Sequence, residues 1–278
     1  MLNIQRLERT GWWHDLIDGI YGPRKGGARI IIDAQDASTG AGKTGLAIAL
    51  AKTLSWGFGY ELQEEDMTLS GAAYLQRWRE HPGAEQPSVI ILDEAAGAGA
   101  ANARRAMSTQ NVNLVKAWQL MRKKRIVSIM TLPQWSLIDK SMRKQADYRL
   151  WCLTKPIGYF KPYRVRTSFD TGEVTTHGYD DVQRIRFPNL DKQRDPHYIY
   201  LAEKKDELLN SGEFDADILE DDEAEPADPE EAKRETKISI AQNLRASDMT
   251  LKEVGAAVGM SDSWVAKYTD RPQEASAD

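Results

Sequence analysis

The stretch ARIIIDAQDASTGAGKTGLAIALAK spans residues 28–52 and contains three successive patterns. Its first seven residues are a short apolar run rich in β-branched side chains, which is typical of a buried strand. A segment with two glycines, Gly40 and Gly42, follows, and then GLAIALAK has the composition and spacing of a helix. The stretch therefore predicts a strand, a glycine-containing loop and a helix, which is the order found where a loop wraps around phosphate groups.

Residues 37–44 have the pattern AxxxxGKT, in which Ala37 stands where the phosphate-binding motif usually has glycine. A methyl group is tolerated there if the local φ is negative. Lys43 is expected to reach the β- and γ-phosphates of ATP, and the Thr44 hydroxyl is expected to bind Mg²⁺. The alternative is an accidental GKT, but the strand before and the helix after favour a true phosphate-binding loop. The expected nucleotide-binding residues are Ser38, Thr39, Gly40, Ala41, Gly42, Lys43, Thr44 and Gly45.

A second motif, PSVIILDEAAG, begins at Pro87 and predicts an apolar strand over residues 89–92 that ends at Asp93 and Glu94. An acidic residue at this place in P-loop enzymes holds Mg²⁺, and a following glutamate polarises the attacking water. Asp93 is therefore the second expected metal ligand, and Glu94 the expected catalytic carboxylate. The alternative is a strand that happens to end in two solvated acids.

A third strand is expected in RIVSIMTLPQ, residues 125–134, after a helix-like segment. It ends in Thr131 and Gln134. A polar side chain at the tip of a strand beside the Asp93 strand can touch the γ-phosphate and report hydrolysis, although strands often end in polar residues.

The three blocks ASTGAGKT, VIILDEA and IMTLPQWSLIDKSMRKQADYRLW resemble the FtsK–HerA superfamily of ATP-driven DNA pumps, over residues 28–155. They are most similar to the small ATPases of archaeal and bacterial viruses and plasmids, including genome-packaging and Zot-like proteins. In that superfamily a glutamine follows the strand beside the one that ends in the two acidic residues, here Asp93 and Glu94. A helix with an arginine and another strand come next. Gln134 and Arg143 occupy these places. The chain departs from the family at Ala37 and has no obvious family-specific tail.

The resemblance implies an α/β fold, a P-loop NTPase sandwich with a mainly parallel sheet, and a ligand at the carboxyl ends of the strands. It implies an ATP-hydrolysing motor that translocates or packages DNA, with ATP and Mg²⁺ as cofactors. The implied partners are double-stranded DNA, other copies in a homo-oligomeric ring (hexamer or pentamer), and capsid or portal proteins. Arg143 is then the expected trans-acting arginine finger, with Arg104, Arg105 and Arg122 as competitors.

Two other functions remain open on the sequence. One is an ATP-dependent DNA-binding regulator or partition-type switch, in which hydrolysis times assembly without translocation. The other is an ATPase that exports filaments or protein. A nuclease constellation after the ATPase core is not evident, which argues against a large terminase with its own cutting domain.

Basic residues that can bind a phosphate backbone cluster at several places in the first 205 residues. Residues 159–179 also predict a hairpin around the turn at 170–172. Its first strand carries Lys161, Arg164 and Arg166, which either face a DNA backbone or form an ordinary solvated surface.

Residues 206–235 contain fourteen acidic residues against two basic ones, although the whole chain has a net charge of only −5. The rest of the chain is therefore net positive. This composition is typical of a solvated linker. We expect a P-loop ATPase domain over residues 1–205, an acidic flexible linker over 206–235 and a small domain over 236–278.

The last of these segments has the pattern of a small all-α helix-turn-helix domain. Thr250 or Asp248 is placed to cap a helix from Leu251, and Gly259 allows a tight turn. Ser261 or Asp262 is placed to cap a second helix. A DNA-recognition face would then contain Ser261, Ser263, Trp264 and Lys267, whereas the alternative is a helical hairpin that docks a protein.

The single cysteine, Cys152, cannot form an internal disulfide, which favours a reducing compartment. The charged N-terminus lacks the apolar segment of a signal peptide, and no apolar run is long enough to span a membrane. We therefore expect a cytoplasmic protein, located in the host cytoplasm if it is viral.

Overall fold

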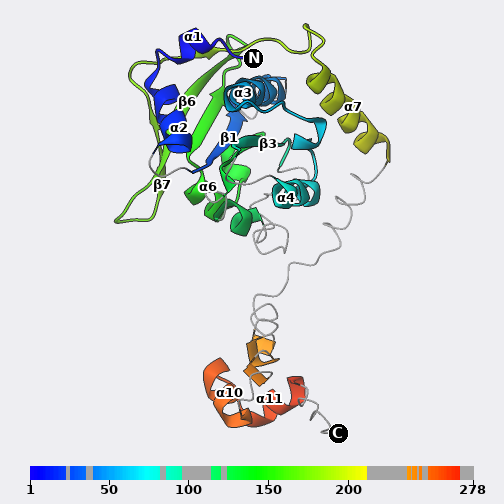
Figure 1. Ribbon diagram of the computed structural model, residues 1–278. Coiled ribbons are helices and arrows are strands. Elements are labelled where there is room, and N and C mark those ends of the chain that lie inside the picture. Colours follow the sequence, from blue (N-terminus) through cyan, green and yellow to red (C-terminus); the bar gives the residue numbers. More distant parts are fainter. Residues whose placement is uncertain are drawn as a thin grey trace. The chain divides into compact units, whose positions relative to one another are not determined.

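A computed structural model describes residues 1–22, 26–35, 40–81, 86–95, 114–119, 124–211, 237–238, 240–242, 244–245 and 250–269 (Figure 1). The chain divides into two compact units, Met1–Phe214 and Asp215–Asp278.

The first unit is built on one sheet with the strand order β2-β3-β4-β1-β5-β6-β7, and β8 pairs with β6. The neighbours from β2 to β5 along this order are parallel, and the pairs that β6 makes are antiparallel. The fold is therefore α/β with a mostly parallel central sheet, as the sequence predicted. The strands are β1 Ala28–Ala34, β2 Met67–Thr68, β3 Ser88–Leu92, β4 Ile126–Thr131, β5 Tyr148–Cys152, β6 Tyr159–Thr167, β7 Val174–Gly178 and β8 Ile185–Arg186.

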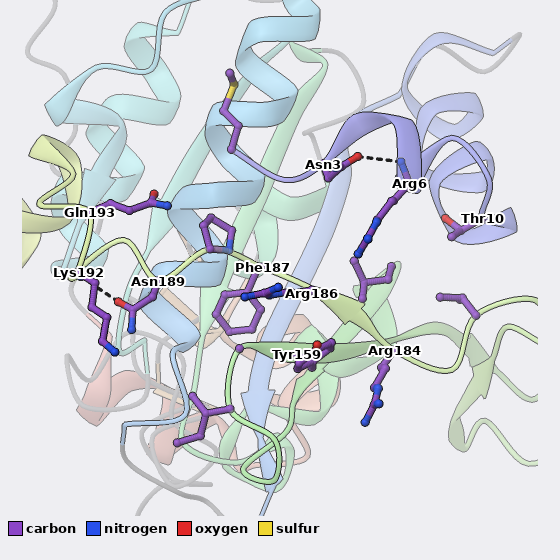
Figure 2. A pocket seen from close by; sticks show the side chains of 16 residues that line it. Asn3, Arg6, Thr10, Tyr159, Arg184, Arg186, Phe187, Asn189, Lys192 and Gln193 are labelled. Carbon is purple, nitrogen blue, oxygen red and sulfur yellow. Dashed lines mark hydrogen bonds between the residues drawn. The ribbon is translucent and has the colours of Figure 1, made fainter.

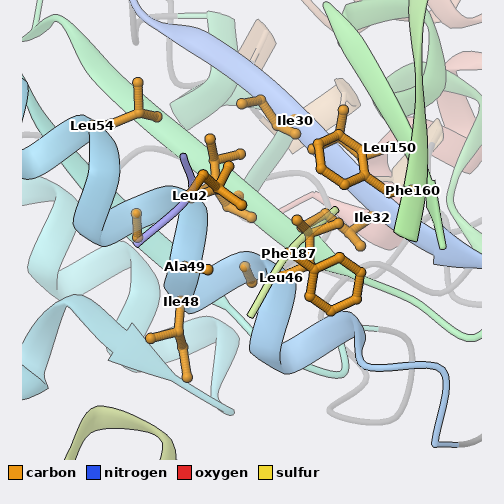
Figure 3. Packing of buried hydrophobic residues seen from close by; sticks show 14 of the residues in the cluster. Leu2, Ile30, Ile32, Leu46, Ile48, Ala49, Leu54, Leu150, Phe160 and Phe187 are labelled. Carbon is orange, nitrogen blue, oxygen red and sulfur yellow. The ribbon is translucent and has the colours of Figure 1, made fainter. Parts of the chain in front are cut away.

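The central strands are buried on both faces, which explains their continuous apolar sequences. Side chains alternate between the faces of a sheet, so Ile30 and Ile32 belong to one hydrophobic cluster and Ile31 to the other. Figure 3 shows Ile30 and Ile32 packed with Leu46 and Leu54 of the helix that follows β1. Burial on both faces thus fixes the register in which β1 presents its carboxyl end to the following loop.

Helices cover both faces. Residues of α2 (Gly11–Tyr21) and α3 (Lys43–Phe58) contribute to the cluster of Ile30, and residues of α4 (Gly71–Glu80) and α6 (Lys140–Gln145) to the cluster of Ile31. None of the helices that the structure describes is long and apolar enough to cross a membrane. The other short elements of this unit are α1 Ile4–Leu7, η2 Glu64–Asp66 and η4 Trp135–Leu137.

The final helix of this unit, α7 (Pro196–Ser211), lies against α3. Its start is held by Asp195, which accepts a hydrogen bond from the His197 N–H and forms an ion pair with Lys52 of α3. The helix continues past the domain boundary expected after residue 205 and ends at Ser211. Residues 212–236, which contain most of the expected linker, lie outside the described residues.

The hairpin expected around residues 170–172 is present as β6 and β7, and Gly172 has a φ of +65° in the turn. The three basic residues of β6 do not share one face, because alternation puts Lys161 opposite Arg164 and Arg166. Arg164 pairs with Asp15 at 3.3 Å and stacks on Tyr148. A DNA-binding surface made of all three residues is therefore excluded by the strand geometry.

The described part of the second unit contains α10 (Leu251–Val258) and α11 (Asp262–Tyr268). Thr250 and Glu253 form a capping box at the start of α10, Gly259 ends it with a φ of +66°, and Ser261 caps α11. A Cβ at Gly255 would lie 2.8 Å from the Met260 carbonyl oxygen, so only glycine fits beside this turn. A DNA-binding role for these helices stays a prediction.

Candidate functional site

The loop between β1 and α3 is described from Gly40 onward, and Ala37, Ser38 and Thr39 lie outside the described residues. Gly40 and Gly42 have φ values of +76° and +84°, a region that favours glycine. Gly42 is the N-cap of α3, and it has no side chain that could accept a hydrogen bond from the first turn of that helix. The first N–H groups of an α-helix point away from the helix body, so the start of α3 suits an anion.

Phe187 packs against this loop: a Cβ on Gly42 would lie 3.0 Å from its ring. The same aromatic ring is part of the wall of a cavity of about 770 Å³ (Figure 2). The cavity is also lined by Tyr159 and by basic residues that include Arg6, Arg186 and Lys192, and none of the described residues that line it is acidic. It is therefore suited to the part of an anionic ligand that extends beyond the loop.

Thr44 and Asp93 meet at the carboxyl ends of β1 and β3. The Thr44 hydroxyl lies 2.9 Å from Asp93 Oδ2 and 3.2 Å from Oδ1. Asp93 is fully buried, and Thr131 at the end of β4 donates its hydroxyl proton to Asp93 Oδ1. The Asp93 N–H also donates to the Thr68 carbonyl at 2.8 Å. Neighbouring strands on both sides thus hold the Asp93 carboxylate toward Thr44.

Glu94 occupies an unusual backbone position, with a φ of +53°. A residue other than glycine in the left-handed region costs energy and is found most often at functional sites. The Glu94 N–H donates to Thr131 Oγ1 at 2.9 Å, which helps to hold this conformation. The Glu94 side chain is 56% exposed, whereas that of Asp93 is fully buried. The two adjacent carboxylates are therefore in different environments, one enclosed and one open to a ligand.

Lys205 of α7 reaches the same carboxylates. Its Nζ lies 2.8 Å from Asp93 Oδ2, 2.7 Å from Glu94 Oε1 and 3.3 Å from Thr44 Oγ1. Burial alone would lower the pKa of Lys205, but the charges and hydrogen bonds of Asp93 and Glu94 hold that pKa above its ordinary value. The ammonium group is therefore charged, and it lies among the oxygen atoms expected to bind a metal.

The oxygen atoms of Thr44 and Asp93 fit Mg²⁺. Mg²⁺ prefers hard oxygen ligands, and proteins that use it with a nucleotide supply one or two carboxylates while phosphates and water complete the coordination. Among the described residues no group of three or more His, Cys, Asp or Glu could hold a metal ion by itself. The donors present thus suit a metal that arrives with a phosphate ligand.

Lys43 begins α3, directly after the loop. Its charge acts on the thiol of Cys152, at the carboxyl end of the neighbouring strand β5: burial raises the pKa of this thiol to about 12, and Lys43 opposes that rise. Lys43 is thus at the same edge of the sheet as Thr44 and Asp93.

Gln134 follows β4 at this edge and is exposed at the start of η4. The next residue, Trp135, donates its N–H to Asp33 Oδ2 at 3.2 Å, so the segment is held to the carboxyl end of β1. This position suits a group that contacts a phosphate ligand at the loop.

The structure does not bring Arg143 to Thr44 and Asp93, contrary to the expectation that it lies at the nucleotide edge. Arg143 is on α6, in the crossover that returns the chain from the carboxyl end of β4 to the amino end of β5. Asp147 follows and pairs with Arg29 near the start of β1. The physical reason is that a parallel strand must be re-entered at its amino end. A trans-acting role for Arg143 stays a prediction.

A buried ion pair supports the Gln134 segment. Asp33 of β1 is fully buried and accepts two hydrogen bonds from Arg149 of β5, at 2.9 and 2.6 Å. Burial raises the pKa of Asp33, and the Arg149 guanidinium opposes that rise. Arg149 also lies over the ring of Trp135 at 5.4 Å. The pair therefore joins β1, β5 and the segment after β4.

Arg149→Ala is expected to lower the free energy of unfolding by about 3 kcal/mol, because removing one partner of a buried pair leaves its charge uncompensated. Urea unfolding followed by circular dichroism measures this change. Arg166→Ala removes an exposed arginine of β6 and should change the free energy by less than about 0.5 kcal/mol. Equal stabilities of the two variants would contradict the role assigned to the pair.

Lys205 was not predicted from the sequence as a site residue. Its only signal is periodic: Leu201 is buried, and Lys205 and Leu208 follow at intervals that put all three on one helix face. A lysine between two inward-facing leucines indicates a partner on the protein, but it does not say which one.

Comparisons with known proteins give distant structural likenesses only. No protein-family model and no curated protein matches the chain. The N-terminal domain of zonular occludens toxin from Neisseria meningitidis is similar with 14% identity over 56% of this chain and 95% of that chain, at a TM-score of 0.37. The genome packaging NTPase B204 from Sulfolobus turreted icosahedral virus 2, in complex with sulfate, is similar with 11% identity over 54% of this chain and 96% of that chain, at a TM-score of 0.35. What the chain does is therefore inferred from its own residues.

Proposed function

We propose that the chain is a Mg²⁺-dependent ATPase that uses hydrolysis to move or package double-stranded DNA. The observation that carries the ATPase part is the direct contact of Thr44 and Asp93, at 2.9 Å, beside the start of α3, where the N-cap is Gly42. A hydroxyl and a buried carboxylate at this place supply the protein ligands for Mg²⁺, and the loop supplies the N–H groups for phosphate.

Each residue of the site then has a distinct task. Backbone N–H groups of residues 38–45 and the Lys43 ammonium would hold the β- and γ-phosphates. Thr44 and Asp93 hold Mg²⁺, which when bound neutralises charge on the phosphates. Glu94 accepts a hydrogen bond from the attacking water at a carboxylate oxygen and orients it toward the γ-phosphorus. Gln134 contacts the γ-phosphate and reports its loss.

Charge supports DNA as the partner. The chain outside residues 206–235 is net positive, and Lys140 and Lys144 of α6 are exposed in the described part. In the second unit, Ser263 and Lys267 of α11 are exposed, whereas Trp264 packs against the small hydrophobic cluster of that unit. The proposed DNA-contacting face of α11 therefore contains Ser261, Ser263 and Lys267 rather than Trp264.

The proposal includes a ring of identical subunits, five or six, in which Arg143 is the candidate finger toward a neighbour's nucleotide. It also includes capsid or portal proteins as partners and the host cytoplasm as the location. These parts rest on the motif resemblance alone.

The test of the motor is the ATPase rate as a function of duplex length and sequence. A DNA-moving motor is expected to be stimulated by long duplexes of any sequence, and less by short ones. Stimulation by one short specific site would favour the regulatory switch, and no stimulation by any DNA would favour the export ATPase.

Removal of residues 236–278 is expected to leave the basal ATPase rate intact and to weaken DNA binding. The two hydrophobic clusters of the first unit contain no residue of the second unit, which has its own cluster of Ala241, Val254, Val258 and Val265, so we expect the first unit to fold without it. DNA affinity of the full and shortened chains should be compared at several salt concentrations, because phosphate contacts are salt-dependent. Equal affinities throughout would contradict a DNA-binding role for this segment.

A further inference from the structure

The metal-binding oxygens of the proposed ATPase site already hold a cation of the chain itself. Lys205 Nζ contacts Asp93, Glu94 and Thr44 at 2.8, 2.7 and 3.3 Å. The Lys205 side chain is 25% exposed and that of Asp93 is not exposed, so this is an enclosed contact and not a surface ion pair.

The position of Lys205 follows from the way α7 packs. Asp195, just before α7, pairs with Lys52 in the second half of α3, at 2.6 Å. Lys205 contacts Thr44 in the first turn of α3. The two helices therefore run antiparallel, and ten residues of α7 at about 1.5 Å per residue cover the distance from Lys52 to the loop. The anchor at Asp195 sets which turn of α7 meets the carboxylates.

Lys205 and Mg²⁺ need the same oxygens. Mg²⁺ binds a ligand oxygen at about 2.1 Å and demands a nearly octahedral shell. A metal on Thr44 Oγ1 and near Asp93 would lie next to the ammonium group, and two cations in one enclosed place repel each other strongly. The carboxylates can therefore serve one of the two cations at a time.

We propose that Lys205 competes with the divalent cation for the same site. Its ammonium group occupies the oxygens of Thr44, Asp93 and Glu94 until Mg²⁺-nucleotide displaces it. This inference rests on the proposed ATPase function and adds a form of regulation to that site. The beginning of α7 stays anchored, because the Asp195–Lys52 pair and the contact of His197 with the Leu62 carbonyl lie away from the metal site. The second half of α7 loses the contacts that Lys205 makes with Thr44, Asp93 and Glu94.

This displacement has a direction along the chain. Leu201 and Leu208 flank Lys205 on the same face of α7, so release of the lysine loosens the helix near its carboxyl end. The second unit, Asp215–Asp278, follows soon after α7 in the sequence. Binding of Mg²⁺-nucleotide thereby changes the attachment of the last turns of α7, the helix that precedes the second unit in the sequence.

The neighbouring Lys204 provides a matched control. It has the same charge and lies on the same turn of α7, but it is exposed and pairs with Glu207 instead of the site carboxylates. Lys205→Met removes the charge while keeping a long apolar stem between Leu201 and Leu208. Lys204→Met makes the same chemical change outside the site.

The test measures ADP affinity of the full chain by calorimetry, once in Mg²⁺ and once in EDTA. In Mg²⁺, Lys205→Met is expected to bind ADP about tenfold more tightly than the unmodified chain does, which corresponds to about 1.4 kcal/mol. In EDTA, the variant and the unmodified chain are expected to bind ADP equally tightly. Lys204→Met is expected to match the unmodified chain in both conditions. The EDTA measurement also shows that the loop of each variant is intact.

Hydrogen exchange supplies a second readout. In the unmodified chain, Mg²⁺-ADP should raise exchange in residues 201–211 and ADP in EDTA should not, whereas Lys205→Met should show the raised exchange without ligand.

An unchanged ratio of the Mg²⁺ and EDTA affinities in Lys205→Met overturns the competitor role. Weaker Mg²⁺-ADP binding by that variant also overturns it, since Lys205 would then assist the ligand. Absence of ADP binding by the unmodified chain in both conditions would instead overturn the proposed ATPase and this inference with it.

Discussion

Lys43→Ala is expected to abolish nucleotide turnover. Lys43 is the only cation in the segment of residues 36–45, so no other residue of the loop supplies positive charge to the β- and γ-phosphates. It stands at the first position of α3, directly after Gly42 turns the backbone with a φ of +84°. Charge-assisted hydrogen bonds to phosphate are among the stronger contacts in proteins, and a site left without its cation loses them together.

Phosphate release and binding of a fluorescent nucleotide measure this effect. Lys140→Ala, which removes an exposed lysine of α6, is the control and should keep both activities. The Lys43 variant should unfold at the same urea concentration as the unmodified chain, so that a loss of turnover reports the site. Hydrolysis close to normal in the purified Lys43 variant would remove the loop from the proposed mechanism.

Glu94→Gln is expected to keep ATP binding and to slow hydrolysis by about 10²–10⁴-fold, the usual contribution of a group that positions or activates the attacking water. The substitution leaves the backbone N–H that donates to Thr131 and keeps nearly the same side-chain volume. The Glu94 side chain is 56% exposed, and Asp93 still balances the Lys205 charge when Glu94 is replaced. Single-turnover hydrolysis and nucleotide affinity, measured together, separate chemistry from binding.

Asp93→Asn is the matched comparison, since it makes the same chemical change one residue earlier. Asp93 is buried and contacts Thr44, so this variant should lose the Mg²⁺ dependence of nucleotide binding. If Glu94→Gln weakened binding but left the rate of the chemical step unchanged, the two carboxylates would exchange roles.

Several elements could be predicted from the sequence because their signals are local. The strand expected over residues 28–34 has those bounds in the structure, since an apolar β-branched run ends at the loop. Gly40 and Gly42 were expected to supply special backbone conformations, and both have positive φ. The caps at Thr250 and Ser261 and the turn at Gly259 follow in the same way from neighbouring residues.

The sequence by itself thus determined the strand of residues 28–34, the glycine-containing loop after it and the acidic pair Asp93-Glu94. It also determined that they share one edge of the sheet, because parallel strands bring their carboxyl ends together. Only the tertiary structure decided which side chains reach that edge. Lys205 and Glu94 are 111 residues apart, and their contact depends on the packing of α7 along α3. Arg143 was drawn away from the edge by the crossover to β5, and Arg164 was taken out of the basic surface by its pair with Asp15. Local patterns set backbone conformation, whereas the partner of a charged side chain depends on which distant element is packed beside it.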